Sequence, residues 1–437
     1  MNNMTFARWG SLRAGLLAGL LAAGALAHAK GGGDATVPGD ILVRLRSTAA
    51  LQPLLAKHQL TLAGQFGARP IYRLRVIGAA DVHAKVDALA TELDVIAAEE
   101  NAVHSSPEAR GHSGWAIGTP GAYTAQWAPA ALRLPEAHKL STGAGMRVAV
   151  LDTGIDAAHP AFAGRLLKGF DFVDFDSDPS EVGSAVTHEA YGHGTHVAGL
   201  VALVAPAAKI MPLRVLDAAG VGNAWVLAEA MLYAIDPDGN PATDDGAQVI
   251  NMSLGSLNRT ELLGSIGLLA SCNIPAVIVE PADDFSDPGY NADKQRCGAS
   301  AGAVVIAAAG NDGSDDLRQY PAAEGFYGLL SVAASTQTSR LAAFSNFGSK
   351  VDVAAPGEGL NSAVPGGGFG TWSGTSMAAP LAAGTAALLR ATEPALSARD
   401  VVQRLTRVSA ALCGAQLRRI DAAAVLLNTA PPPTVCR

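Results

Sequence analysis

The stretch GHGTHVAG, residues 192–199, contains two histidines three positions apart, His193 and His196, at the expected start of a helix. Residues at this spacing lie on one helix face, so both imidazoles would meet the same neighbours. They could be two metal ligands, a catalytic base with a packed neighbour, or two ordinary core histidines. The other polar residues of the chain have to decide.

Further polar residues follow apolar segments. Asp152 ends MRVAVLD, Ser253 follows QVINM, and Asn311 follows AVVIAAAG. We expect these side chains at one edge of a sheet, because reactive groups gather at the carboxyl ends of parallel strands. Ser376, in SGTSMAAP, begins an apolar helix, where free backbone N–H groups and the helix dipole favour developing negative charge.

Each of these residues also has a simpler explanation. Asp152 could end a strand in a turn, Ser376 could be a helix N-cap, and Asn311 could hold a left-handed bend. The elements around them and their occurrence together therefore matter more than any one residue.

Hydrophobic patterning predicts the elements that carry these residues. From Gln126 onward, apolar runs alternate with segments of helical periodicity, which indicates an α/β fold with a doubly wound, mostly parallel sheet. The expected strands are 146–152, 209–216, 248–255, 303–311 and 329–334, and the expected helices include 193–204, 225–234 and 376–390. The G-x-G of GAGMRV precedes a strand instead of following one, so it does not indicate dinucleotide binding.

A small α+β domain is predicted before this sheet, at residues 38–106. In ILVRLR, the side chains of Ile41, Val43 and Leu45 share one strand face, and IYRLRV shows the same alternation. DVHAKVDALATEL carries an apolar stripe at helical spacing that extends to Leu93.

A segment rich in Gly, Ser, Pro and Ala follows, at residues 104–125. It has neither period, so we expect an exposed linker at 107–125 between the small domain and a larger one at 126–437.

The first residues are typical of an export signal. Arg8 and Arg13 precede the apolar run AGLLAGLLAAGALA, and AHA supplies small residues for cleavage after Ala29. A membrane anchor is the alternative, but the run is shorter than the roughly 20 residues needed to span a bilayer. The sequence predicts a signal peptide at 1–29, a linker at 30–37, and a secreted or periplasmic protein without stable membrane insertion after signal removal.

The chain has four cysteines and no C-x-x-C pair, which fits an exported protein with two disulfides. Buried thiols are the alternative. Of the three connectivities that four cysteines allow, we favour the sequence neighbours, Cys272 with Cys297 and Cys413 with Cys436.

Composition limits the partners. The chain has 437 residues, of which 49% are hydrophobic and 16% charged, enough for a large core and a smaller domain. Its formal net charge of -8 and the absence of a dense Lys/Arg run argue against a nucleic-acid partner.

Five of these segments resemble the motifs of subtilisin-like serine endopeptidases: VAVLDTGID, GHGTHVAG, INMSLGS, AAAGND and SGTSMAAP. They occur in the family's order over about residues 126–430. The resemblance implies an enzyme that acts on protein or peptide substrates. The domain at 38–106 is similar to the family's propeptide, which assists folding and inhibits the enzyme until it is cut away.

The resemblance also implies the roles of the site residues. His193 is the base that takes the proton of Ser376, and the Asp152 carboxylate orients the imidazole and stabilises its charged form. The Asn311 amide and the Ser376 backbone N–H bind the oxyanion. His196 is then a packed neighbour, since a metal site would need a third ligand that the surrounding sequence does not supply.

Substrate contacts follow from the same matching. The substrate would lie as an added strand between Gly220–Gly222 and Ser253–Gly255. Ala224, Leu227 and Leu254 would line the pocket for the fourth residue before the cut. Many relatives have a larger residue at the position of Ala224, so this pocket is expected to be roomy and apolar.

Two other function classes fit less well. An α/β-hydrolase esterase would carry G-x-S-x-G and a histidine after its serine, but no histidine follows Ser376. A catalytically inactive binding module would lack a member of the triad, and none is missing. The chain departs from many relatives at Leu381, where they have histidine, and in the long segment between Cys272 and Cys297.

Calcium is the expected cofactor. DFVDFDSD supplies four carboxylates, Asp171, Asp174, Asp176 and Asp178, and such hard oxygen ligands suit calcium. This stretch resembles a calcium loop of thermostable relatives, and a solvated acidic loop is the alternative. A weaker candidate, DPDGNPATDD (236–245), begins like an EF-hand loop but has Ala247 where the glutamate ligand belongs.

Overall fold

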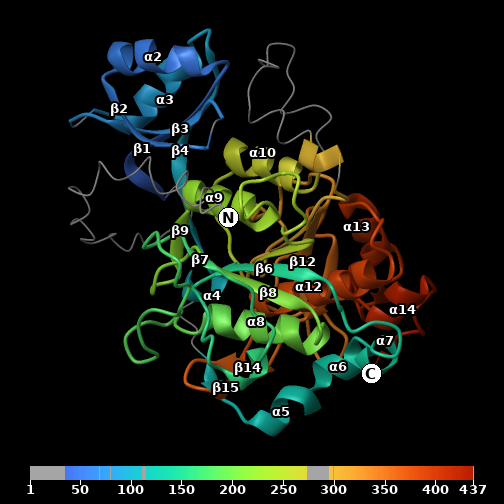
Figure 1. The fold of residues 1–437 in the computed structure, drawn as a ribbon. Coiled ribbons are helices and arrows are strands. Elements are labelled where there is room, and N and C mark those ends of the chain that lie inside the picture. The colour runs from blue at the N-terminus through green and yellow to red at the C-terminus, as the bar shows by residue number, and fades with distance from the viewer. Residues whose placement is uncertain are drawn as a thin grey trace, which may run out of the picture.

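The computed structural model describes residues 35–436, apart from 68, 79, 111–114, 273–294 and 299. The predicted signal peptide therefore lies outside the described residues. Figure 1 shows the small N-terminal domain, in blue, beside the larger α/β domain, with strand β4 (Val95–Ser105) leading from the first toward the second.

The N-terminal domain is an antiparallel sheet with two α-helices and one short 3-10 helix. Its strands lie in the order β2 (Leu60–Gln65), β3 (Ile71–Val76), β1 (Thr36–Leu45) and β4, and its helices are η1 (Thr48–Ala50), α2 (Leu51–His58) and α3 (Val82–Ala90). Ile41, Val43 and Leu45 form one apolar core with Leu89, so the alternation in β1 correctly predicted the buried face. The predicted helical stripe is wrong at its end, because Leu93 lies beyond α3 and is 90% exposed.

The larger domain is built on a nine-stranded sheet. Its strands, in spatial order, are β16 (Ala410–Ala411), β17 (Arg418–Arg419), β13 (Val353–Pro356), β12 (Leu329–Ser335), β11 (Val304–Ala308), β10 (Val249–Met252), β6 (Arg147–Asp152), β8 (Lys209–Arg214) and β7 (Phe170–Asp171). All neighbours pair in parallel except β16 and β17. The prediction of a mostly parallel sheet is confirmed.

Helices cover both faces of this sheet. Within β6, Val148 and Val150 belong to one core and Ala149 and Leu151 to another, because successive side chains of a strand point to opposite faces. The first core packs against α8 (His193–Val204) and α12 (Thr375–Thr392), and the second against α9 (Ala224–Ile235) and α10 (Glu261–Ala270). The doubly wound architecture and the three predicted helices are therefore confirmed.

The other elements surround these layers. A three-stranded sheet contains β14 (Leu360–Val364), β15 (Gly368–Trp372) and β5 (Ala116–Ile117), while β9 (Val221–Asn223) pairs with β4. The remaining helices are α4 (Pro107–Arg110), α5 (Pro120–Ala125), α6 (Trp127–Ala131), α7 (Leu134–Ala137), η2 (Pro160–Phe162), α13 (Ala398–Arg407) and α14 (Ala422–Leu427). None of the helices among the described residues has the length and apolar character that a membrane crossing requires.

The expected exposed linker is wrong at its start. The residues directly after β4 form the short helix α4, and Glu108 within it is only 2% exposed. The composition of this segment predicted a solvated chain, but the Glu108 carboxylate has buried polar partners in the larger domain that no local pattern reveals.

Both favoured disulfides are present. Cys272 is bonded to Cys297, and Cys413 to Cys436. The preference for cysteines close in sequence is thus confirmed, and each bond closes a short segment of the larger domain.

Candidate active site

Asp152 and His193 form a buried, hydrogen-bonded pair. Asp152 is the last residue of β6 and His193 the first of α8, and Nδ1 of His193 lies 2.7 Å from Oδ1 of Asp152. The two residues are 1% and 0% exposed. A carboxylate at Nδ1 holds the ring proton there, which leaves Nε2 of His193 as the atom that can accept a proton.

Gly194 allows α8 to begin against the end of β6. A Cβ atom at this position would lie 2.2 Å from the carbonyl oxygen of Gly154 and 3.0 Å from Cβ of Asp152. No side chain fits in that space. The glycine after His193 therefore permits the close approach that brings its ring to Asp152.

Glu181 is a functional residue that the sequence analysis missed. Its carboxylate accepts hydrogen bonds from the backbone N–H groups of Gly192 and Thr195, at 3.2 and 3.0 Å. The first turn of a helix leaves such N–H groups without helical partners, and a carboxylate there also interacts favourably with the helix dipole. Glu181 thus stabilises the turn that carries His193. The sequence signal for this contact is an acidic residue a short way before the start of a helix.

Ser376 lies in the first turn of α12, beside the end of β10. Its carbonyl oxygen accepts a hydrogen bond from Oγ of Ser253 at 2.8 Å, and its own Oγ lies 3.2 Å from the carbonyl oxygen of Ser253. Oδ1 of Asn311 accepts from the backbone N–H and the hydroxyl of Thr375, both at 2.9 Å, which fixes the amide. The structure thus brings the predicted polar residues together at the carboxyl end of the sheet.

The side chain of Glu108 lies among these groups. Its Oε2 accepts a hydrogen bond from Oγ of Ser376 at 2.6 Å and lies 3.0 Å from Nε2 of His193. Its Oε1 accepts from Nδ2 of Asn311 at 2.8 Å. One carboxylate from the N-terminal segment therefore joins Ser376, His193 and Asn311.

Gly374 provides the space for this carboxylate. A Cβ atom there would lie 1.8 Å from Oε1 of Glu108 and 3.1 Å from Nδ2 of Asn311. Only glycine at this position leaves the space open. An oxyanion site needs such a space, since its donors must converge on one oxygen atom.

Charges in the site act strongly on one another because water is excluded. Burial alone would lower the pKa of His193, but the carboxylates of Asp152 and Glu108 outweigh it and raise that pKa to about 10. Burial would raise the pKa of Glu108, but the charge and hydrogen bonds of His193, with those of Ser376 and Asn311, hold it below its usual value. The His193 imidazolium between two carboxylates is the stable state of this arrangement.

His196 is packed, as expected. Its Nε2 lies 3.2 and 3.1 Å from the carbonyl oxygens of Leu360 and Gly370, to which it donates. Burial and the charge of His193 lower the pKa of His196 to about 3. The Trp372 ring makes edge-to-face contacts with both imidazoles, so His196 packs behind His193 against the same indole.

The two segments predicted to bind substrate hold a strand of the chain itself. The backbone N–H of Ser105 donates to the carbonyl oxygen of Gly255, and that of Gly255 donates back, both at 2.9 Å. Ser106 donates to the carbonyl oxygen of Gly220 at 3.1 Å, and His104 is paired with Gly222 in the antiparallel ladder of β4 and β9. The other predicted residues here, Ser253, Leu254, Ala224 and Leu227, are all 0% exposed.

The predicted calcium loop is organised around an arginine. Nη1 of Arg214 lies 2.5 Å from Oδ2 of both Asp171 and Asp174. Oδ1 of Asp176 accepts from the N–H of Asp178, and Oδ1 of Asp178 accepts from Ser180. Two of the four carboxylates are therefore neutralised by the chain itself, and the other two cap turns.

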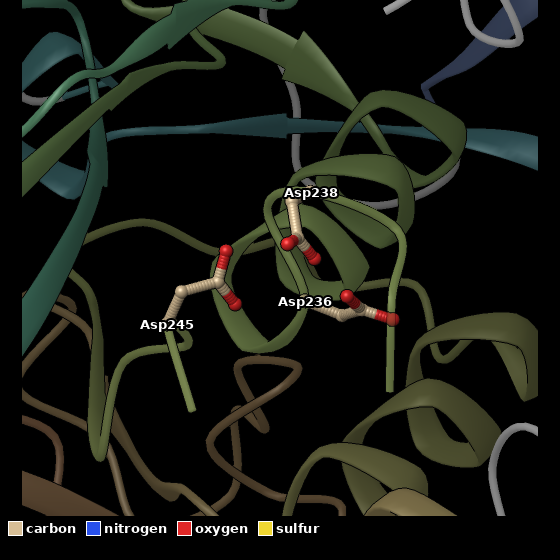
Figure 2. A group of neighbouring side chains, drawn as sticks. All are labelled: Asp236, Asp238 and Asp245. Carbon is tan, nitrogen blue, oxygen red and sulfur yellow. The ribbon is translucent and has the colours of Figure 1, made fainter. Parts of the chain in front are cut away.

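The weaker acidic candidate has a different geometry. Asp236, Asp238 and Asp245, at the end of α9 and in the loop before β10, each place an oxygen within 4.8 Å of the others (Figure 2). Burial and the charges of Asp238 and Asp245 raise the pKa of Asp236 to about 6. Among the described residues this is where three carboxylates converge.

Comparison with known proteins decides the family. The model of the subtilase family, peptidase S8, matches residues 143–430. The chain belongs to the subtilase family. The subtilase domain thus begins just before β6 and includes Asp152, His193, Asn311 and Ser376, and the chain is a serine endopeptidase.

Curated relatives agree with this assignment. The chain is 36% identical to thermitase of Thermoactinomyces vulgaris over 274 residues, which are 60% of the chain and 81% of thermitase. It is 33% identical to subtilisin E of Bacillus subtilis over 288 residues, 63% of each chain. A thermophilic serine proteinase of a Bacillus strain is 37% identical over 56% of the chain but is itself covered over only 52% of its length.

Solved structures show the same fold. A protease of Pseudoalteromonas arctica has 29% identity and a TM-score of 0.56, over 71% of this subtilase and 99% of that chain. Fervidolysin of Fervidobacterium pennivorans, a keratinolytic enzyme related to subtilisin, has 21% identity and a TM-score of 0.67. That alignment covers 91% of this chain and 62% of fervidolysin, so the likeness in fold extends beyond the subtilase domain.

Proposed function

We propose that this subtilase cuts peptide bonds through an acyl-enzyme intermediate on Ser376, and that it is made as an exported precursor that processes itself. The observation that carries the proposal is the meeting of His193, Ser376 and Asn311 around one buried carboxylate, with Asp152 behind His193. The test is Ser376→Ala, which should leave the precursor uncut.

The chemistry follows from the contacts. When the Glu108 carboxylate is replaced by a peptide carbonyl group, Nε2 of His193 takes the proton of Ser376 as Oγ attacks the carbonyl carbon. The resulting imidazolium is stabilised by Asp152 at 2.7 Å. The same proton then passes to the leaving amine. Water attacks the acyl-enzyme by the same two steps and releases the second product.

The oxyanion has a prepared donor. Nδ2 of Asn311 points to an anionic oxygen in this structure, 2.8 Å away, and its own oxygen is held by Thr375. A donor fixed in advance needs no reorganisation when charge develops on the carbonyl oxygen, so it stabilises the transition state more than the substrate.

The N-terminal domain is proposed as an inhibitory propeptide. Residues 103–106 pair with the two segments assigned to substrate, and the Glu108 carboxylate is hydrogen-bonded to Ser376. No substrate can therefore reach Ser376 while the domain is in place. Removal of residues 30–106 by a cut within 107–125 would open the site. The predicted signal peptide and the two disulfides favour a secreted or periplasmic location.

We predict that the mature enzyme prefers Phe or Leu to Ala at the fourth position before the cut. Ala224, Leu227 and Leu254 are apolar and buried in the precursor, and a side chain as small as that of Ala224 should leave room for a large substrate side chain in the mature enzyme. Ala224→Tyr should reverse the preference and penalise Phe by about 1–3 kcal/mol through overpacking. The measurement is kcat/KM on peptides that differ only at that position.

A matched variant separates the pocket from general damage. Ala228 lies one helical turn further along α9, and Ala228→Ser should leave the preference at the fourth position before the cut unchanged. A wild-type profile that is flat between Ala, Leu and Phe would contradict the assignment of this pocket.

Calcium is proposed as a structural ion. The cluster of Asp236, Asp238 and Asp245 fits it best, because three carboxylates converge there and the repulsion of the other two on Asp236 exceeds the attraction of Arg296, whereas Arg214 already neutralises part of the loop at 171–178. A bound cation would remove the repulsion between these carboxylates and stabilise the folded state.

We predict that calcium raises the melting temperature of the uncut Ser376→Ala precursor by several degrees, about what saturation at 100 times Kd provides. Asp238→Asn should abolish this shift, and Asp176→Asn should keep it. The opposite result would place the ion in the loop at 171–178, and equal melting curves in calcium and in chelator would exclude a structural calcium ion.

A further inference from the structure

We propose that Glu108 is the inhibitory residue of the precursor: its side-chain carboxylate, rather than a peptide carbonyl group, occupies the oxyanion site and locks Ser376 and His193 together. This inference rests on the proposed function, because it concerns the same nucleophile. It adds that the site is a carboxylate-binding site and that the precursor limits its own processing through one side chain.

The geometry supports inhibition rather than substrate binding. A scissile carbonyl group would have to bring its carbon atom to Oγ of Ser376 and its oxygen to Nδ2 of Asn311. Both places are taken by the Glu108 carboxylate, at 2.6 and 2.8 Å. The structure therefore shows the nucleophile donating its hydrogen bond to an anion instead of to the base that must deprotonate it.

The base is also withdrawn from the reaction. Nε2 of His193 lies 3.0 Å from Oε2 of Glu108, which is an acceptor, so Nε2 must carry a proton for this contact to be favourable. An imidazolium cannot accept the proton of Ser376. Glu108 thus blocks the oxyanion donor and stabilises the inactive protonation state of the base at the same time.

The rest of the chain is arranged to deliver this carboxylate. The pairing of β4 with β9 and of Ser105 with Gly255 fixes the backbone directly before α4. Gly374 leaves the space that the carboxylate fills, since a Cβ atom there would overlap Oε1. Both the charge and the length of the Glu108 side chain matter. A shorter acid on the same backbone could not contact all three partners.

One consequence concerns processing. Cleavage at any bond requires a carbonyl group in the oxyanion site, so Glu108 must first leave it. The rate of precursor conversion should therefore depend on how tightly Glu108 is held, even if the bond that is cut lies elsewhere in 107–125.

The test compares full-length precursors that differ at one residue. Glu108→Gln keeps the shape but loses the charge, and Glu108→Asp keeps the charge but shortens the reach. Both should convert to the mature form at least about 10-fold faster than the wild type, since a buried hydrogen bond to a charged group is lost or weakened. Glu100→Gln, which removes a charge from the preceding strand β4, outside the site, is the control and should convert at the wild-type rate.

A second measurement does not depend on processing. An organophosphorus fluoridate that phosphorylates active serines should label the uncut Glu108→Gln precursor at least about 10-fold faster than the uncut wild type, when intact chains are counted by mass spectrometry at early times. The melting temperature of each uncut chain shows whether the variant is folded.

The outcomes separate this inference from the proposed function. If Ser376→Ala stays uncut but Glu108→Gln, Glu108→Asp and the wild type convert and label at equal rates, the peptidase assignment stands and the role of Glu108 is wrong. If the Glu108 variants convert more slowly than the wild type while they remain folded, Glu108 assists processing and the inference is overturned. If Ser376→Ala matures like the wild type, the proposed function itself fails.

Discussion

Replacement of Ser376 by alanine should abolish peptide hydrolysis and leave the chain as a precursor that still carries its N-terminal domain. Oγ of Ser376 is the proposed nucleophile, and it shares the Glu108 carboxylate with Nε2 of His193 in the precursor, so its loss removes the attacking atom and not merely a contact. The expected fall in kcat is of the order of 10⁶-fold. Electrophoresis of freshly expressed protein and N-terminal sequencing of the product measure the effect on processing.

A serine in the same segment provides the control. Ser373 accepts a hydrogen bond from the N–H of Gly359 at 2.9 Å and does not reach the reacting groups. Ser373→Ala should therefore mature and hydrolyse peptides at close to the wild-type rate. Equal maturation of Ser376→Ala and the wild type, in a host without other proteases, would show that another enzyme cuts the precursor.

Much of the fold that positions Ser376 could be predicted from local patterning. Strands β6, β10 and β11, which precede Asn311 and Ser253 or end at Asp152, are largely apolar because both faces of a parallel sheet are buried. The start of α8 at His193 and of α12 beside Ser376 could also be predicted, since small residues and glycines precede long apolar runs. These features depend on residues that are close in sequence.

Features that depend on distant partners could not be predicted in this way. Strand β4 contains Glu99, which looks like a solvated residue, but its carboxylate accepts from the backbone N–H groups of Glu261 and Leu262 at the start of α10, at 2.6 and 3.0 Å. Burial raises the pKa of Glu99 to about 7. Nothing in the sequence around it indicates a partner that far along the chain.

The same reason explains the residue at the centre of the site. Glu108 follows a proline in a segment rich in Gly, Ser and Ala, and its composition indicated an exposed linker. Its three partners come from α8, α12 and the loop after β11. A carboxylate is stable in the interior only when such partners are assembled, so its burial depends on the completed fold rather than on its neighbours.

Replacement of Asp152 by asparagine should keep the fold and lower kcat by about 10⁴-fold. The asparagine side chain can still accept a hydrogen bond, but its amide group also favours the wrong imidazole tautomer and cannot stabilise the imidazolium. The measurement is kcat on a peptide substrate, compared with Asp400→Asn. Asp400 belongs to the capping box of α13, so that control removes a carboxylate from the same domain without touching the site.

The pH dependence of stability provides an independent check on the Asp152 contact. The pKa of His193 in the folded precursor, about 10, is above its ordinary value of 6.5, so its interactions stabilise fully below about pH 6.5 and are lost as the pH rises toward 10. In the uncut Ser376→Ala background, the free energy of unfolding should fall over this range. Asp152→Asn should make that fall smaller, because only Glu108 then raises the pKa of His193. An undiminished fall in the Asp152→Asn chain would mean that Asp152 does not hold the charged imidazole, and the triad assignment would lose its electrostatic basis.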